Sequence, residues 1–298
     1  MTDTTRYILF AVAIPFAACL ALGAPALLAR SRDDERQRWR WLIAVALGAA
    51  AAIAFVGITG LPSEKWQSVM WAPLCAILAG VLAVRNCNCW RLRTAASLIS
   101  ATTALAIWPV VAQEPMWIRL LAPGCALVGC LAIATAAARR ASPLVGLQLG
   151  VATAGCAAVI GISGSVTLGL PVGAIGTGLL ALTLLSLVRR RPADLAAAPF
   201  VVIPTLACAL VVRWLYASSE GAPIHPAAFA LAGSATLGLA LATPLRREPS
   251  RRARLAGAIA ALAVTIGLTA GAIGLALTPP DGDTGDDPYA DMYRQLGP

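Results

Sequence analysis

The sequence predicts an all-α integral membrane protein: a polytopic bundle of about ten transmembrane helices, with both termini outside the cytoplasm. Three observations predict this fold. Of the 298 residues, 59% are hydrophobic and only 12% are charged, apolar segments long enough to cross a bilayer recur along the chain, and arginines gather in every second connection. A soluble domain contains about 25% charged residues. A disordered chain is poor in apolar residues, so the composition excludes disorder for most of the length.

Ten apolar segments are long enough to cross a membrane, since a helix of about 20 residues spans a hydrocarbon core of about 30 Å. Clusters of arginine, proline or acidic residues bound these segments. In chain order they are 7–29, 41–59, 68–84, 95–112, 120–138, 144–162, 166–188, 196–216, 227–245 and 255–277. A tight turn at Ser163-Gly164-Ser165 joins the sixth segment to the seventh.

The first segment, 7–29, is predicted to be a retained helix rather than a cleaved secretory signal. Its apolar run continues well past Cys19, whereas the apolar core of a signal has about 7 to 15 residues. Cleavage would also leave the arginine-rich stretch 30–40 on the wrong side of the membrane.

The arginines predict the orientation, because positively charged short loops stay on the cytoplasmic side. The connections after segments one, three, five, seven and nine hold 18 of the 23 Lys and Arg residues. The remaining five are Arg6, Lys65, Arg119, Arg213 and Arg294. This alternation predicts a multi-pass protein of the inner (plasma) membrane with extracytoplasmic N- and C-termini.

Tryptophan positions agree with these boundaries. Tryptophan prefers the membrane interface, because its ring is half apolar and half polar. All 8 Trp residues lie at or near a segment end, which supports the predicted segment ends independently of charge.

The chain divides into a ten-span transmembrane domain, 1–278, and an acidic extracytoplasmic tail, 279–298. Stretches 166–176 and 264–274 are nearly identical. They are interpreted either as the remnant of an inverted duplication, with halves 1–140 and 141–278, or as chance similarity between helices rich in small residues. In the tail, Asp287-Pro288 is typical of a helix start. A short helix there would place Tyr289, Met292 and Tyr293 on one face, as a candidate partner contact, and a frayed tail is the alternative.

Several kinds of chemistry lack the residues that they need. None of the 14 acidic residues lies inside a predicted segment, which argues against an intramembrane proton relay or aspartyl protease. The single histidine, His225, stands in an outer loop, so a haem held by two histidines is excluded. We therefore expect no enzyme activity, no cofactor and no metal site. The basic residues flank apolar segments, so we expect lipid rather than nucleic acid as the partner.

Cysteine usage leaves one question open. Six of the 8 Cys residues lie in apolar segments, where a thiol packs as a small hydrophobic group. Cys87 and Cys89 instead stand between arginines in a predicted cytoplasmic loop. Reactive thiols, half of a metal site, a palmitoylation site and plain loop residues are all compatible with this pair.

A solute path is best predicted in the seventh segment. Gly169, Pro171, Gly173 and Gly176 lie close together there, and a helix broken at this point would offer backbone groups to a solute. Gln148 and Arg213 are further candidates, Arg213 either as a snorkelling side chain or as an anion contact. The alternative is close helix packing, because glycines four residues apart allow helices to approach in lipid. Gly169 with Gly173, and Gly267 with Gly271, have that spacing.

The sequence alone is compatible with two functions. The first is a non-enzymatic permease or carrier for a small neutral or weakly anionic solute, favoured by the proline- and glycine-containing segments. The second is a membrane-embedded scaffold subunit of a larger envelope complex for secretion, conjugation or electron transfer, favoured by the absence of intramembrane acids. In that case the tail and the glycine faces would contact other membrane or periplasmic proteins.

Overall fold

A computed structural model describes most of the predicted transmembrane domain. The described residues are 3–28, 41–60, 65–85, 89–112, 115–116, 143–188, 195, 197–220, 224–237 and 251–278. Every regular element in these ranges is a helix, which confirms the all-α prediction for this part of the chain. The fifth predicted segment, 120–138, and the tail, 279–298, lie outside the described residues.

The elements of the N-terminal part follow the first four predicted segments. The first segment consists of three contiguous helices, and the middle one is a π-helix. The bounds are α1 Asp3–Ile8, η1 Leu9–Ala13, α2 Ile14–Leu28, α4 Trp41–Thr59, the 3-10 helix η2 Lys65–Met70, α5 Trp71–Arg85 and α6 Cys89–Val111.

The elements of the C-terminal part follow segments six, seven, eight and ten and the first part of segment nine, whose residues 238–245 lie outside the described residues. The bounds are α8 Pro143–Ile162, α9 Val166–Val188, α10 Ala198–Glu220, α11 Pro226–Ser234, the 3-10 helix η3 Ala235–Leu237 and α13 Arg251–Leu277. Helices α4 and α9 have the predicted bounds exactly as numbered. Helices α6, α10 and α13 extend beyond theirs, because residues outside the hydrocarbon core can continue a helix at the water interface.

Within the described residues, six helices are long and apolar enough to cross a membrane. The qualifying stretches are Thr4–Pro25, Trp41–Thr59, Val145–Ile162, Val166–Ser186, Ala198–Ala217 and Leu255–Leu277. A helix forms most of its backbone hydrogen bonds within its own segment, as a lipid environment requires. The chain is therefore a multi-pass helical membrane protein.

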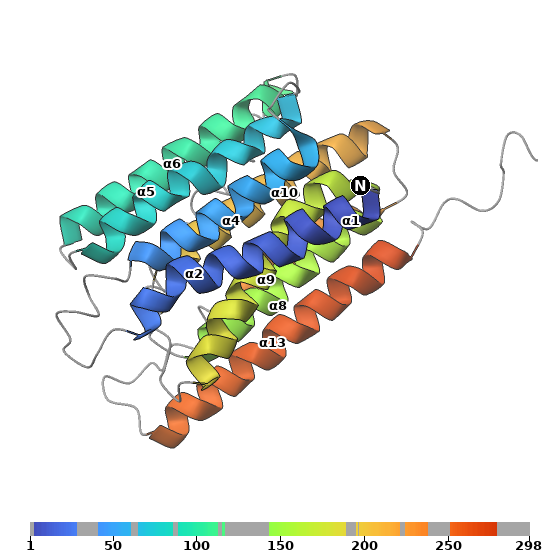
Figure 1. Cartoon of the computed structure of the whole chain (residues 1–298). Helices are drawn as coiled ribbons and strands as arrows, with labels where there is room; N and C mark the ends of the chain where they lie inside the picture. Colours follow the sequence, from blue (N-terminus) through green and yellow to red (C-terminus); the bar gives the residue numbers. More distant parts are fainter. Residues whose placement is uncertain are drawn as a thin grey trace, which may run out of the picture.

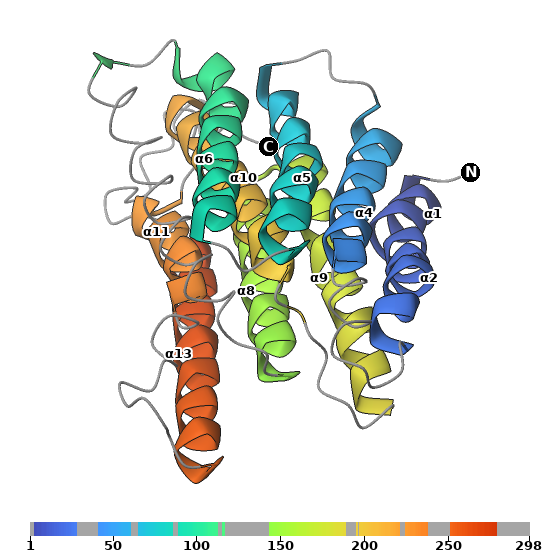
Figure 2. The ribbon, with the colours of Figure 1, turned by 90° about the vertical axis from the view of Figure 1, so that its left-hand side faces the viewer.

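The helices lie side by side along a common direction (Figure 1). Helix α9 occupies the interior and packs against α2, α4 and α8. Helices α5 and α6 form one flank, where α10 also contacts both of them. Helix α13 forms the opposite flank in Figure 1 and packs against α8 and α11, and α11 lies beside it in Figure 2.

Contacts near the helix ends define the direction of each helix. The Arg6 side chain in α1 donates to the carbonyl oxygen of Gly57 near the end of α4. The first segment, which α1, η1 and α2 form, is therefore antiparallel to α4. The Ser68 hydroxyl just before α5 donates to the carbonyl oxygen of Ala106 near the end of α6. Within each of these two pairs, successive helices therefore run in opposite directions.

Contacts across the interior define the directions of further helices. Gly80 near the end of α5 lies against Ala197, at the start of α10, so α5 and α10 are antiparallel. Arg213 near the end of α10 bonds to Ser163 at the end of α8, so α10 and α8 run in parallel. It follows that α6 and α8 both end on the same side of the bundle.

Candidate functional site

The seventh segment forms one unbroken helix. Helix α9 runs from Val166 to Val188 with Pro171 inside it, so the expectation of a helix broken at Gly169–Gly176 is wrong. Pro171 stands early in the helix, where its missing N–H deprives a single carbonyl oxygen, that of Thr167, of its donor. In lipid no water competes for backbone groups, so the glycines that follow keep their helical bonds.

The glycines of α9 form a close contact with α8. A methyl group added at Gly169 would lie 3.0 Å from the carbonyl oxygen of Ala157 and 3.3 Å from the backbone nitrogen of Gly161. One added at Gly173 would lie 3.8 Å from the Ala157 side chain. Gly176 faces α8 in the same way. The glycine face therefore serves helix packing, which was the alternative left open by the sequence.

Gln148 links α8 to α13. Its side chain is buried, and its Nε2 donates to the carbonyl oxygen of Ala258 at 3.1 Å. A buried amide needs such a partner, because an unpaired polar group in an apolar environment is costly. Gln148, which the sequence also offers as a candidate solute contact, therefore forms a contact between two helices.

Arg213 is buried rather than snorkelling, with only 6% of its surface exposed. Its Nε donates to the Ser163 hydroxyl at 2.7 Å, and its Nη2 donates to the Ser163 carbonyl oxygen. The terminal carbonyls of a helix lack helical donors, and here α10 supplies donors to the end of α8. The Arg213 side chain thus holds the turn in which Gly164 adopts a φ of +91°.

Buried hydroxyl groups in the bundle are mostly satisfied within their own helix. Thr103, Thr153, Thr183 and Thr205 each donate to the carbonyl oxygen four residues earlier, at 2.6–2.8 Å. Thr269 is the exception, since its buried hydroxyl has no hydrogen-bond partner among the described residues.

The second glycine pair, Gly267 and Gly271, lies at exposed positions of α13. A methyl group added at Gly267 would meet nothing within 4 Å among the described atoms, and one added at Gly271 would lie 3.8 Å from Leu231 of α11. Gly267 is thus free of contact with the described bundle, and its predicted role in helix packing stays a prediction that requires another chain.

The remaining candidates lie mostly outside the described residues. This is so for Tyr289, Met292, Tyr293 and Cys87, whereas Cys89 begins α6. His225 is the N-cap of α11, where its Nδ1 accepts from the Ala227 N–H at 3.2 Å. Within the described ranges no group of three His, Cys, Asp or Glu residues could hold a metal ion.

One feature that sequence reasoning missed is a surface groove of about 660 Å³ on α4. None of the predicted site residues lines it. Its floor includes Ala52 and Gly57, and its lining includes Arg6. The contact between Arg6 and α4 depends on how each of the two helices is rotated about its own axis. Both helices are apolar on all sides, so the spacing of their residues does not reveal this rotation.

No family model, curated protein or solved structure significantly matches the chain.

Proposed function

We propose that the chain is a membrane-embedded scaffold subunit of a larger envelope complex. One observation carries this proposal: the residues from which a solute path would be built are engaged in contacts between helices. The α9 glycines lie on α8, Gln148 bonds to α13, and Arg213 bonds to the α8–α9 turn. A bundle fastened in this way suits a rigid platform better than alternating access.

A carrier for a small neutral or weakly anionic solute is the second candidate. Pro171 favours it, because a proline inside α9 leaves the Thr167 carbonyl oxygen without a helical donor, and a transporter could use such an oxygen as a ligand.

The proposal includes a membrane arrangement. We propose ten crossings of the inner (plasma) membrane, with both termini outside the cytoplasm. The distribution of the 23 Lys and Arg residues supports this, as do the alternating directions of the described helices. Non-cytoplasmic ends would present the tail residues Tyr289, Met292 and Tyr293 to membrane or periplasmic partners. The proposal assigns no catalytic residue and no cofactor.

Purification of the tagged full-length chain from its own cells in a mild detergent tests the scaffold. We expect other envelope proteins to co-purify in fixed stoichiometry. We also expect them to be lost when Tyr289, Met292 and Tyr293 are all replaced by alanine. Replacing Asp281, Asp283, Asp286 and Asp287 by asparagine is the matched control, because it changes the linker but leaves the proposed contact face intact.

Two results would argue against the scaffold. One is a chain that elutes alone, without stoichiometric partners, in every mild detergent. The other is a set of partners that the triple alanine variant retains in full, which would remove the tail from the proposal. A chain that elutes alone would leave the carrier as the better candidate.

A further inference from the structure

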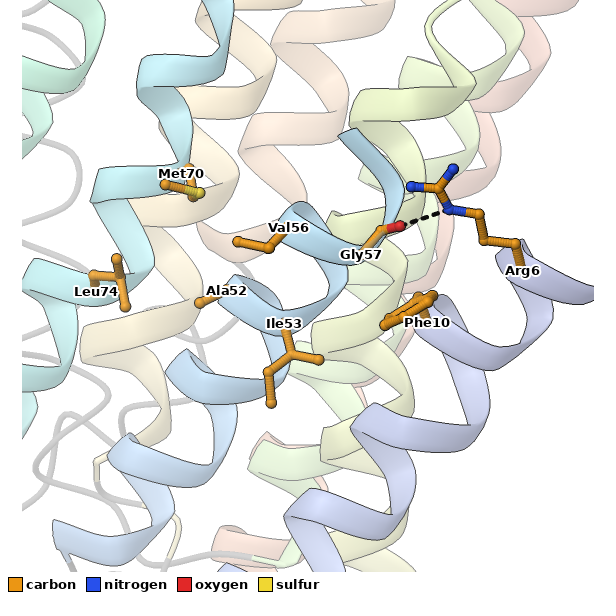
Figure 3. A pocket seen from close by; sticks show the side chains of 8 residues that line it. All are labelled: Arg6, Phe10, Ala52, Ile53, Val56, Gly57, Met70 and Leu74. Atoms are coloured by element: carbon orange, nitrogen blue, oxygen red, sulfur yellow. Dashed lines mark hydrogen bonds between the residues drawn. The ribbon is translucent and has the colours of Figure 1, made fainter. Parts of the chain in front are cut away.

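The groove on α4 is an open, mostly apolar surface pocket with a cation, Arg6, among its lining residues. Ala52, Ile53 and Val56 of α4 line it, together with Met70 and Leu74 from η2 and α5. Phe10 of η1 closes the other side, packed over Gly57 so closely that a methyl group at Gly57 would collide with its ring. Figure 3 shows these side chains on neighbouring helices, with Arg6 beyond Phe10. The small residue Ala52 keeps the floor hollow.

Arg6 is held in place by only one of its donor groups. Its Nε donates to the Gly57 carbonyl oxygen at 2.8 Å, and a cation is favourable here because the end of a helix carries partial negative charge. The two terminal nitrogens extend beyond this bond (Figure 3), on a side chain that is exposed. Among the described side chains none accepts a bond from them, so a planar pair of donors faces outward beside the groove.

The mouth of the groove lies at the level of the lipid headgroups. Gly57 is in the last turn of α4, which ends at Thr59. Trp71, which begins α5 next to Met70, is 51% exposed, and exposed tryptophan is typical of the membrane interface. From Gly57 inward to Ala52 the groove follows α4 for about 7.5 Å, at 1.5 Å per residue. It therefore leads from the headgroup region into the hydrocarbon.

We propose that this groove binds one anionic phospholipid, with an acyl chain over Ala52 and the phosphate on Arg6. Ligand sites of about 300–1,000 Å³ are mostly apolar with a few polar groups that fix orientation, and this groove has that composition. Arginine is suited to the phosphate because its two terminal nitrogens can donate side by side. A second apolar helix would match the floor and walls but would leave the guanidinium without an anion. The inference is independent of the scaffold proposal.

Lipid competition on the delipidated full-length protein tests the site. The protein is mixed with equal amounts of phosphatidylglycerol and phosphatidylcholine carrying identical chains, and bound lipid is counted by native mass spectrometry. We expect one tightly held lipid per chain and about tenfold more phosphatidylglycerol than phosphatidylcholine, which corresponds to ~1.4 kcal/mol. Equal binding of the two lipids by the wild-type protein would overturn the proposal.

Two variants separate the headgroup from the chain. With Arg6→Gln we expect the headgroup preference to fall close to one, and with Ala52→Leu we expect both lipids to be lost at least about fivefold. Lys65→Gln removes an equal charge from the start of η2, and Ala263→Leu enlarges an exposed residue of α13. Both controls should bind as the wild type does.

Other occupants would give different results. A dimer that forms without lipid and is broken by Ala52→Leu would assign the groove to a second copy of the chain. Loss of lipid in Lys65→Gln to the same extent as in Arg6→Gln would show a general charge effect. Either result would overturn the specific site, and thermal unfolding of each variant verifies that it is folded.

Discussion

Arg213 is a buried cation whose acceptors come from a helix end. Moving a charge out of water is costly unless it is paired or hydrogen-bonded. The Ser163 carbonyl oxygen lies at the end of α8, where the helix dipole concentrates negative charge, and Arg213 donates to it and to the Ser163 hydroxyl. One side chain of α10 thereby fixes the turn between α8 and α9.

Arg213→Met tests this role. Methionine fills similar space but donates no hydrogen bond, so the Ser163 carbonyl oxygen loses its charged partner. We expect a loss of about 1–3 kcal/mol in the free energy of unfolding, the usual cost of a buried group left unsatisfied. Denaturant unfolding in one fixed detergent measures it.

Arg6→Met is the matched control, because Arg6 is exposed and makes a single bond to a carbonyl oxygen. We expect a change within about 0.5 kcal/mol in lipid-free detergent. If both variants lose the same stability, then Arg213 owes its effect to charge or helix propensity rather than to the turn.

The sequence could predict the depth of Arg213 in the membrane but not the side of α10 on which it lies. Its position near the end of segment 196–216 is compatible with a snorkelling side chain. The side on which it emerges depends on the rotation of α10, a helix that is apolar on all faces and largely enclosed, with 78% of its spanning residues buried. Such a helix carries no amphipathic pattern from which its orientation could be deduced.

At the scale of elements, the α8–α9 hairpin depends on glycine. The backbones approach closely at Gly169, where the nearest atoms are backbone atoms of Ala157 and Gly161. A side chain there cannot be accommodated by rotation of a neighbour, because the obstacle is another helix backbone. The sequence predicted both helix bounds and the turn correctly. It could not distinguish a packing glycine from a helix-breaking one, because that depends on what lies opposite.

Gly169→Leu should therefore separate the two helices. We expect a loss of at least about 2 kcal/mol, in the range of overpacked cores, measured by denaturant unfolding in the same detergent. Gly267→Leu is the control on α13, since a side chain at Gly267 meets open space. It should be neutral in the monomer.

The control also tests the second glycine pair. If Gly267→Leu lowers stability or dissociates an oligomer, then Gly267 and Gly271 contact another chain, as their spacing predicts. If Gly169→Leu is as stable as the wild type, then the hairpin does not depend on this contact.

At the scale of the whole molecule, burial separates interior from peripheral helices. Spanning residues are 61% buried in α9 but only 22% buried in the first and last spanning helices, Thr4–Pro25 and Leu255–Leu277. Exposed apolar side chains such as Ile259 and Ile266 cover the outer face of α13. In a bilayer these faces contact lipid, and in the proposed complex they are available to neighbouring subunits.

The directions of α6 and α8 bear on the number of crossings. Both helices end on the side of the bundle where Ser68 meets Ala106 and Arg213 meets Ser163. The end of α6 and the start of α8 therefore lie on opposite sides of the bundle, as a crossing between them predicts. The predicted fifth segment, 120–138, lies in this interval and has the length to make it.

Reporter fusions would test this crossing directly. We expect alkaline phosphatase, which is active only outside the cytoplasm, to be active when fused after Gln113 and inactive after Arg140, and a fluorescent protein that folds only in the cytoplasm to give the reverse. Fusions after Ala112 and at Pro298 should behave alike, since both lie on the extracytoplasmic side in the ten-span arrangement. Equal activity after Gln113 and Arg140 would remove the fifth crossing. Because arginines keep short loops in the cytoplasm, replacing Arg139 and Arg140 by glutamine should weaken the contrast without abolishing it.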